Sequence, residues 1–224
     1  MIRILRHLQN ERGNMTIFTL TIYWFMFMLV FVALFNFSTV FVDKEQASNS
    51  AQQASIAAVK DIYDEMIVAI MAYDASITRL KNPNFVWPRV EAATSQLKAS
   101  HPDWAASEIK YGAIDLALNS ALPGNPELQF YVYAGLQNAT SRIPGVVTKV
   151  LSDNKATLTG SSVKLFNSDN RIEVITSVKY ESESMGFDFI PAYSEQIYQT
   201  GESRRIDFID EVNDWFYINI PILG

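Results

Sequence analysis

The feature that most constrains this chain is a long stretch near its N-terminus without a charged side chain. No Asp, Glu, Lys or Arg occurs between Arg12 and Asp43, and most residues between them are aromatic or aliphatic. A helix needs about 20 apolar residues to cross a bilayer, at a rise of about 1.5 Å per residue. A core helix of a soluble protein rarely presents apolar residues on every face over such a length. We therefore expect residues 14–42 to form a transmembrane helix.

A cleaved secretory signal fits this stretch less well. Its apolar region would span about 7–15 residues and end in small residues. Here the apolar run is longer and ends in Val40, Phe41 and Val42. The sequence therefore favours a helix that stays in the membrane.

The charges on the two flanks of the apolar stretch differ in sign. Arginines precede it at positions 3, 6 and 12, whereas Asp43, Lys44 and Glu45 follow it. The positive-inside rule places the arginine flank in the cytoplasm. The sequence thus predicts a single-pass cell-membrane protein in contact with membrane lipid. Residues 1–13 form its basic cytoplasmic leader, and the body is extracytoplasmic.

Composition excludes several function classes. The chain has no cysteine, which rules out a disulfide framework and thiolate chemistry, and its net charge is −6. An acidic chain without clustered Lys or Arg is a poor nucleic-acid binder. Histidine occurs at His7 and His101 alone. No phosphate loop or hydrolase motif is present, so we predict no catalytic, cofactor-binding or metal-ligating residue.

A helical pattern continues beyond the membrane stretch through residues 43–81. Apolar residues recur three or four apart as far as Leu80, and the stop signal Asn82-Pro83 follows. The first turns carry a stripe of small residues: Ala47, Ala51, Ala54 and Ala58. We expect this helix-packing stripe to face a partner helix, although alanine's high helix propensity explains it equally well.

Residues 82–224 are expected to form an extracytoplasmic head that begins with a helical insertion. Trp87-Pro88 opens a short helix that reaches Lys98. Asp103 is the expected cap of a second helix, which runs from Trp104 to Ala121 and stops at the Pro- and Gly-rich residues that follow.

The rest of the head is expected to be sheet. Residues 128–133 are β-branched and aromatic, and a turn at 167–170 separates the run 160–166 from the alternating run 172–180. Residues 187–190 suggest a short strand, residues 193–210 are ambiguous between strand and helix, and the tail 215–221 is apolar enough to be packed. The predicted fold class is α+β: a long N-terminal helix packed on a small antiparallel sheet, with a helical insertion.

The run from Glu11 to Phe18, which leads into the apolar helix, resembles the start of a known family. So do the Ala/Ser/Gln-rich residues 46–59 and the late strand 172–180. These features are similar to TadE/TadG-like pseudopilins of tight-adherence (Flp-type) pilus systems, within the type IV pilin-like group.

The resemblance implies that a prepilin peptidase removes a basic leader that ends in Gly. The cleaved bond would join Gly13 and Asn14. Pilins commonly carry a Glu near the start of the mature helix, at the position that Phe18 occupies here. This departure leaves open whether the leader is cleaved and whether the chain enters a filament or stays in the assembly base.

Acidic residues near the C-terminus form the remaining candidate cluster. They are Asp207, Asp210, Glu211 and Asp214. Their spacing suits one helix face, and a solvated surface explains them better than a cation site, because no Gly-containing calcium loop frames them. Asp61, Asp64 and Glu65 have the same interpretation.

The leading hypothesis is a non-enzymatic component of a surface pilus or related secretion machine. Its partners would be other pilin-like subunits and the assembly platform. The alternative is a membrane-tethered binding or sensory module, which a polar-lined pocket in the head would favour. A membrane-anchored hydrolase comes third, and it would need carboxylates around His101.

Overall fold

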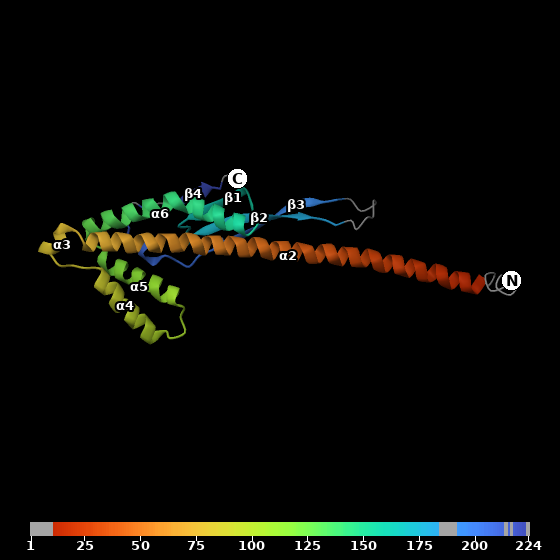
Figure 1. Ribbon diagram of the computed structural model, residues 1–224, viewed down its shortest axis with the longest axis horizontal. Helices are drawn as coiled ribbons and strands as arrows, with labels where there is room; N and C mark the ends of the chain where they lie inside the picture. The colour runs from red at the N-terminus through yellow and green to blue at the C-terminus, as the bar shows by residue number, and fades with distance from the viewer. Residues whose placement is uncertain (1–10, 184–191, 213–214, 216, 223–224) are drawn as a thin grey trace. The chain divides into compact units, whose positions relative to one another are not determined.

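The computed structural model describes residues 11–183, 192–212, 215 and 217–222. Two compact units are formed: residues 1–43 with 179–196, and residues 44–178 with 197–224. We call the second unit the body. The helix α2 (Glu11–Asp74) and the strands β2 (Glu173–Glu181) and β3 (Ser194–Glu202) contribute residues to both units (Figure 1). The fold class is α+β, as predicted.

Helix α2 ends earlier than expected, and residues 75–76 separate it from the short helix α3 (Ile77–Lys81). The reason is the side chain of Asp74. Its carboxylate accepts hydrogen bonds from the backbone N–H groups of Val86 and Trp87, at 2.8 and 2.7 Å. These donors open helix α4 (Trp87–Ser100), which lacks a side-chain cap of its own. The end of one helix therefore supplies the N-terminal capping of another.

Helix α5 (Ala106–Ala121) begins later than the sequence suggested, and Asp103 is not its cap. The carboxylate of Glu108 instead accepts a hydrogen bond from the backbone N–H of Ala105 at 3.1 Å. The helix ends where predicted, before Pro123. In the sequence, Glu108 marks the start of this helix better than Asp103 does, because an acid in the first turn can accept from the free backbone N–H groups there.

The prediction of a strand at residues 128–133 is wrong, because these residues belong to helix α6 (Pro126–Asp153). The side chain of Asn125 caps this helix by accepting from the N–H of Leu128, and Pro126 occupies its first turn. The buried residues follow a helical period: Leu128, Val132, Leu136, Ala139, Ile143, Val147 and Leu151. A Cβ on Gly135 would lie 3.3 Å from the Cβ of Ala69, so α6 packs closely on α2.

The sheet has the strand order β3-β2-β1-β4 and is antiparallel. The predicted hairpin is confirmed as β1 (Thr157–Leu165) and β2, with Val163 paired to Val174. Gly160 has φ +81° and lies in the irregular stretch between Thr157 and Ser162. The expected turn at 167–170 is present, and the side chain of Asn167 accepts from the backbone N–H groups of Asp169 and Arg171.

The C-terminal segments are also assigned. Residues 193–210, ambiguous in the sequence, contribute strand β3 and the start of the 3₁₀ helix η1 (Asp207–Glu211). The apolar tail supplies strand β4 (Ile218–Pro221), which pairs with β1. The expected short strand at 187–190 lies outside the described residues.

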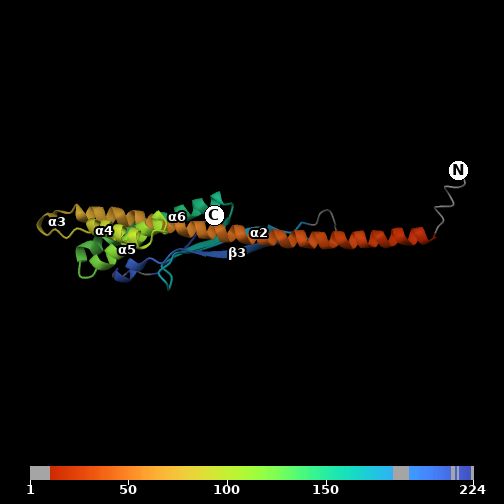
Figure 2. The same ribbon diagram turned by 90° about the horizontal axis from the view of Figure 1, so that it is seen from below.

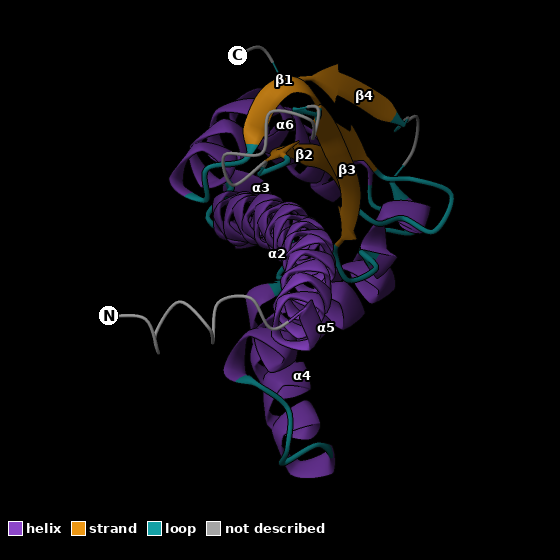
Figure 3. Cartoon of the chain, turned by 90° about the vertical axis from the view of Figure 1, so that its right-hand side faces the viewer, coloured by secondary structure: helices purple, strands orange, loops and turns teal. Residues whose placement is uncertain are grey.

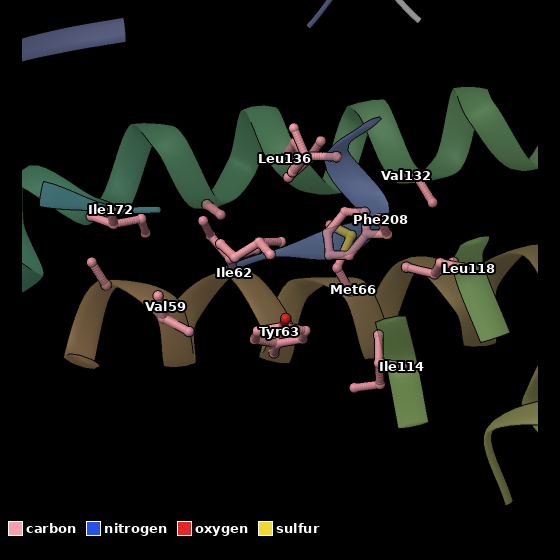
Figure 4. Packing of buried hydrophobic residues seen from close by; sticks show 14 of the residues in the cluster. Val59, Ile62, Tyr63, Met66, Ile114, Leu118, Val132, Leu136, Ile172 and Phe208 are labelled. Carbon is pink, nitrogen blue, oxygen red and sulfur yellow. The ribbon is translucent and has the colours of Figure 1, made fainter. Parts of the chain in front are cut away.

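Within the body, the outer part of α2 is the central element. The sheet and α6 lie on one side of it, and α4 and α5 lie on the other (Figures 1 and 3), so that α4 and α5 are nearest the viewer when the chain is seen from below (Figure 2). Side chains from all these layers meet in one apolar cluster. Figure 4 shows Ile62 and Met66 of α2 between Leu136 of α6 and Ile114 of α5. These residues are at most 1% exposed, so this part of α2 is the spine of the core.

Candidate functional site

The apolar part of α2 presents large side chains on every face. Phe18, Leu20, Phe27 and Leu34 are each between 62 and 68% exposed. This helix is long and apolar enough to cross a membrane, and among the described residues it alone meets that test. The predicted limits of the membrane span, residues 14–42, stay a prediction.

Three threonine hydroxyl groups in this segment bond to the helix itself. Thr19, Thr21 and Thr39 each donate to the backbone carbonyl four residues earlier, at 2.9 to 3.1 Å. Such bonds satisfy the hydroxyls in an apolar environment. Side-chain contacts of these threonines with other helices would therefore rest on packing more than on hydrogen bonds.

Asn36 lies in the apolar segment, and its side chain binds another part of the chain. Its amide N–H donates to the carbonyl of Glu183 at 2.9 Å, and its carbonyl accepts from the N–H of Glu183 at 2.7 Å. The hydroxyl of Tyr180 also donates to Asn36 Oδ1, at 3.2 Å. The amide thus reproduces a pair of strand-like hydrogen bonds at the end of β2.

The expected processing residues Gly13 and Asn14 lie in the first turns of α2. Phe18, which stands where pilins commonly carry Glu, is 66% exposed. Cleavage between Gly13 and Asn14 stays a prediction.

The alanine stripe is covered by the chain itself. Ala47, Ala51, Ala54 and Ala58 are all 0% exposed. A Cβ on Gly201 of β3 would lie 2.3 Å from the backbone of Ala51, so the strand and the helix are in contact at this level. This arrangement differs from the expected stripe facing a partner helix, because a small-residue surface also permits close approach of a chain's own strand.

A buried ion pair in the body is a feature that sequence reasoning missed. Asp115 of α5 is 2% exposed and accepts hydrogen bonds from the Tyr63 hydroxyl at 2.8 and 2.9 Å. The guanidinium of Arg204 pairs with the same carboxylate at 2.9 Å. The ring of Tyr63 stacks on Tyr111 with centroids 4.3 Å apart, and Arg204 lies over both rings. One sequence signal was available: Asp115 is a lone acid in the apolar run 113–118.

Burial dominates the titration of this group. It raises the pKa of Asp115 from its ordinary value of 3.8 to about 7, although Arg204 and the Tyr63 hydrogen bond act in the opposite direction. Burial and the nearby Asp115 charge also raise the pKa of Tyr63. The cluster joins α2, α5 and the segment after β3. This arrangement indicates a structural role. Removing one partner of a buried ion pair destabilises the folded state, because the other charge is left buried without a partner.

The acidic residues near the C-terminus form surface ion pairs. Arg205 pairs with Asp207 at 3.0 Å and with Asp210 at 2.6 Å, while Asp214 lies outside the described residues. No group of three or more Asp, Glu or His side chains able to hold a metal ion occurs in the part of the chain that the structure describes. The interpretation of a solvated surface is therefore retained.

The acids on α2 are neutralised in a similar way. Arg142 of α6 pairs with Asp61 at 2.9 Å and with Glu65 at 2.7 Å, and Asp64 pairs with Lys60 at 2.9 Å and Lys110 at 3.0 Å. These pairs tie α6 and α5 to the spine helix.

His101 does not gather carboxylates among the described residues. Its ring stacks on Trp104 at 4.0 Å between centroids, and its Nδ1 lies 2.9 Å from the Ser100 hydroxyl. The carboxylates that the hydrolase alternative would need around His101 are not among these contacts.

Two cavities in the described part of the body bear on a possible binding function. One, of about 520 Å³, opens between α4, α5 and α2 and is lined mainly by apolar side chains, including Ile67, Trp87 and Ile109. The other, of about 260 Å³, has a charged lining. In this lining Arg204 pairs with Asp115 and Arg205 with Asp207, while the Glu108 carboxylate accepts the Ala105 N–H.

Together these features define a class: an α+β protein with one N-terminal apolar helix able to cross a membrane. The comparison with protein families sharpens this description. Residues 13–61 match the family described as putative Flp pilus-assembly TadE/G-like. The resemblance drawn from the N-terminal residues is thereby confirmed for that segment. No curated protein and no solved structure matches the chain.

Proposed function

We propose that the chain is a non-enzymatic, pseudopilin-like or minor-pilin-like component of a surface pilus or related secretion machine. The observation that carries this proposal is the family match over residues 13–61. The matched segment includes the Gly13–Asn14 junction and the whole apolar part of α2. The match extends into the body, whose apolar core includes Ala54, Ala58 and Val59 of the matched segment.

In this proposal the N-terminal flank is cytoplasmic and the body extracytoplasmic. A prepilin peptidase removes residues 1–13, and the mature chain then starts at Asn14. Contacts to other pilin-like subunits and to the assembly platform form through the apolar helix. Two observations support this assignment: the large side chains there are exposed, and the alanine stripe is already buried in the body.

Processing is tested by N-terminal sequencing of the membrane-extracted chain in cells that contain a prepilin peptidase. The wild type should begin at Asn14, and Gly13→Val should keep its leader. Thr19→Val is the matched control, because it alters the same helix and leaves the junction intact. A wild-type chain that still begins at Met1 would contradict the pseudopilin assignment.

Assembly is tested by cross-linking, which the absence of cysteine makes simple. A single cysteine at Leu20 or Phe27 should form cross-links to a second pilin-like subunit in the membrane. A cysteine at Lys149, on the exposed face of α6, should not. Cross-linking of neither membrane position, in cells with active pilus assembly, would favour the tethered binding module.

A further inference from the structure

The amide of Asn36 is the starting point of this inference, because it lies in a helix that otherwise exposes apolar side chains. Both of its polar groups are bonded to the backbone of Glu183. Its N–H also reaches the carbonyl of Val32 at 3.0 Å. An asparagine that binds both backbone groups of one residue fixes that residue against the helix.

Charged side chains accompany Glu183 to this level of the helix. We use the name hairpin end for the end of the β2–β3 pair, residues 179–183 and 193–196. It carries four exposed charged side chains: Lys179, Glu181, Glu183 and Glu195. Lys179 forms an ion pair with Glu181. Beyond β2, the N–H of Ser182 donates to the carbonyl of Tyr193 at 2.8 Å. Polar backbone and charged side chains thus lie beside residue 36.

We propose that the hydrocarbon core of the bilayer ends at Phe35 and that the hairpin end rests on the phospholipid headgroup layer. Asn36 clamps this hairpin end to the helix. The inference rests on the proposed membrane anchoring. It moves the outer end of the membrane-spanning segment from Val42, where the sequence placed it, to Phe35.

The apolar side chains that follow Asn36 on the helix oppose this position of the boundary. Phe37, Phe41 and Val42 are between 55 and 61% exposed, so they favour a deeper membrane position. However, the insertion cost of one charged residue is about four to twelve times the gain from one apolar residue at the membrane centre. Four charged residues on the hairpin end therefore outweigh three apolar residues on the helix.

The remaining span is long enough, because residues 15–35 supply the roughly 20 residues that a bilayer requires. Phe37 and Phe41 form an edge-to-face pair with centroids 4.8 Å apart, on the helix just outside this span. Tyr180 is well placed for the interface, since its ring is 8% exposed and its hydroxyl binds Asn36. Tyrosines favour this depth, where one end of the ring is apolar and the other is wet.

The boundary is tested with single cysteines in the full-length chain, reconstituted in phosphatidylcholine nanodiscs and treated with a charged maleimide. Glu181→Cys and Tyr193→Cys should react about as fast as the exposed body control Lys149→Cys. Leu20→Cys and Leu34→Cys should react about tenfold or more slowly, because hydrocarbon excludes the reagent and the thiolate.

The outcomes separate the two proposals. If Glu181→Cys and Tyr193→Cys are as slow as Leu34→Cys, the bilayer covers the hairpin end and this inference is overturned. If Leu20→Cys and Leu34→Cys react like the control, the membrane anchoring itself fails.

The clamp is tested by hydrogen exchange of the Glu183 amide in the same nanodiscs. Asn36→Leu removes the acceptor and should increase the exchange rate of this amide by about tenfold. Thr39→Val is the control, because Thr39 bonds to its own helix and should leave the rate unchanged. Equal rates in wild type and Asn36→Leu would overturn the clamp.

Discussion

The two parts of helix α2 differ in what covers their apolar side chains. In the membrane segment, Phe18 and Leu34 are 66 and 62% exposed. In the body, Ile62 and Met66 of the same helix are 1 and 0% exposed. Their charge patterns differ too, because ion pairs line the second segment, whereas the first has no charged residue between Arg12 and Asp43.

This difference shows where an external partner is needed. The body segment finds its apolar partners within the chain, from α5, α6 and the sheet. The apolar segment leaves most of its large side chains exposed among the described residues, as expected of a surface that lipid or other helices would cover. One helix therefore serves two environments, and a substitution should have opposite consequences in the two segments.

The largest effect is expected from charges placed in the membrane segment. Replacing Val30 and Leu34 with arginine should prevent stable membrane integration, since each arginine costs about 2.5–3.5 kcal/mol near the membrane centre. Ile56→Arg is the matched control, because Ile56 is 54% exposed on the body segment of the same helix. Alkaline extraction of membranes measures integration. If the double variant stays in the pellet like Ile56→Arg, the two segments do not differ in environment.

A smaller effect is expected where strand β3 meets the body segment. Gly201→Ala would place a Cβ 2.3 Å from the backbone of Ala51, which has no flexible side chain to move aside. We expect a loss of about 1–3 kcal/mol in the free energy of unfolding. Gly145→Ala in α6 is the control, because a Cβ there meets nothing within 4 Å. It should increase the free energy of unfolding by about 1 kcal/mol, since alanine has a higher helix propensity than glycine. Thermal melting of the full-length chain in detergent compares them, and equal melting temperatures would contradict the close packing.

The effect of Asp115→Asn is expected in the pH dependence of stability. Burial raises the pKa of Asp115 from 3.8 to about 7, so the folded chain keeps a proton that the unfolded chain releases. The contribution of Asp115 to the free energy of unfolding therefore falls as pH rises through this window and is constant above it.

Asp115→Asn should remove this contribution, so the difference between variant and wild type should change across the window. Denaturant titrations of wild type and variant from about pH 4 to about pH 8 measure this difference. A constant difference for Asp115→Asn would show that its carboxylate titrates alike in both states.

The sequence by itself determined the features that depend on local pattern. The membrane helix follows from the composition of one uninterrupted segment, because insertion is summed residue by residue. The β1–β2 hairpin follows from alternation and from the turn at Asn167, which are both short-range properties. The family match likewise covers contiguous residues, from Gly13 to Asp61, and it does not extend to the strand 172–180 on which the resemblance also rested.

Only the tertiary structure decided the features that join distant residues. The β propensity of residues 128–133 was overridden, because α6 buries a helical face against α2 through Gly135. The alanine stripe could have packed on a partner helix or on the chain itself. In the structure Ala51 of the stripe lies against strand β3, and the neighbouring Gln52–Glu202 hydrogen bond joins residues 150 positions apart in the chain. Likewise, Asp115 meets Arg204 and Asn36 meets Glu183 only after folding. Such pairings depend on which surfaces fit together in space, and spacing along the chain does not encode that fit.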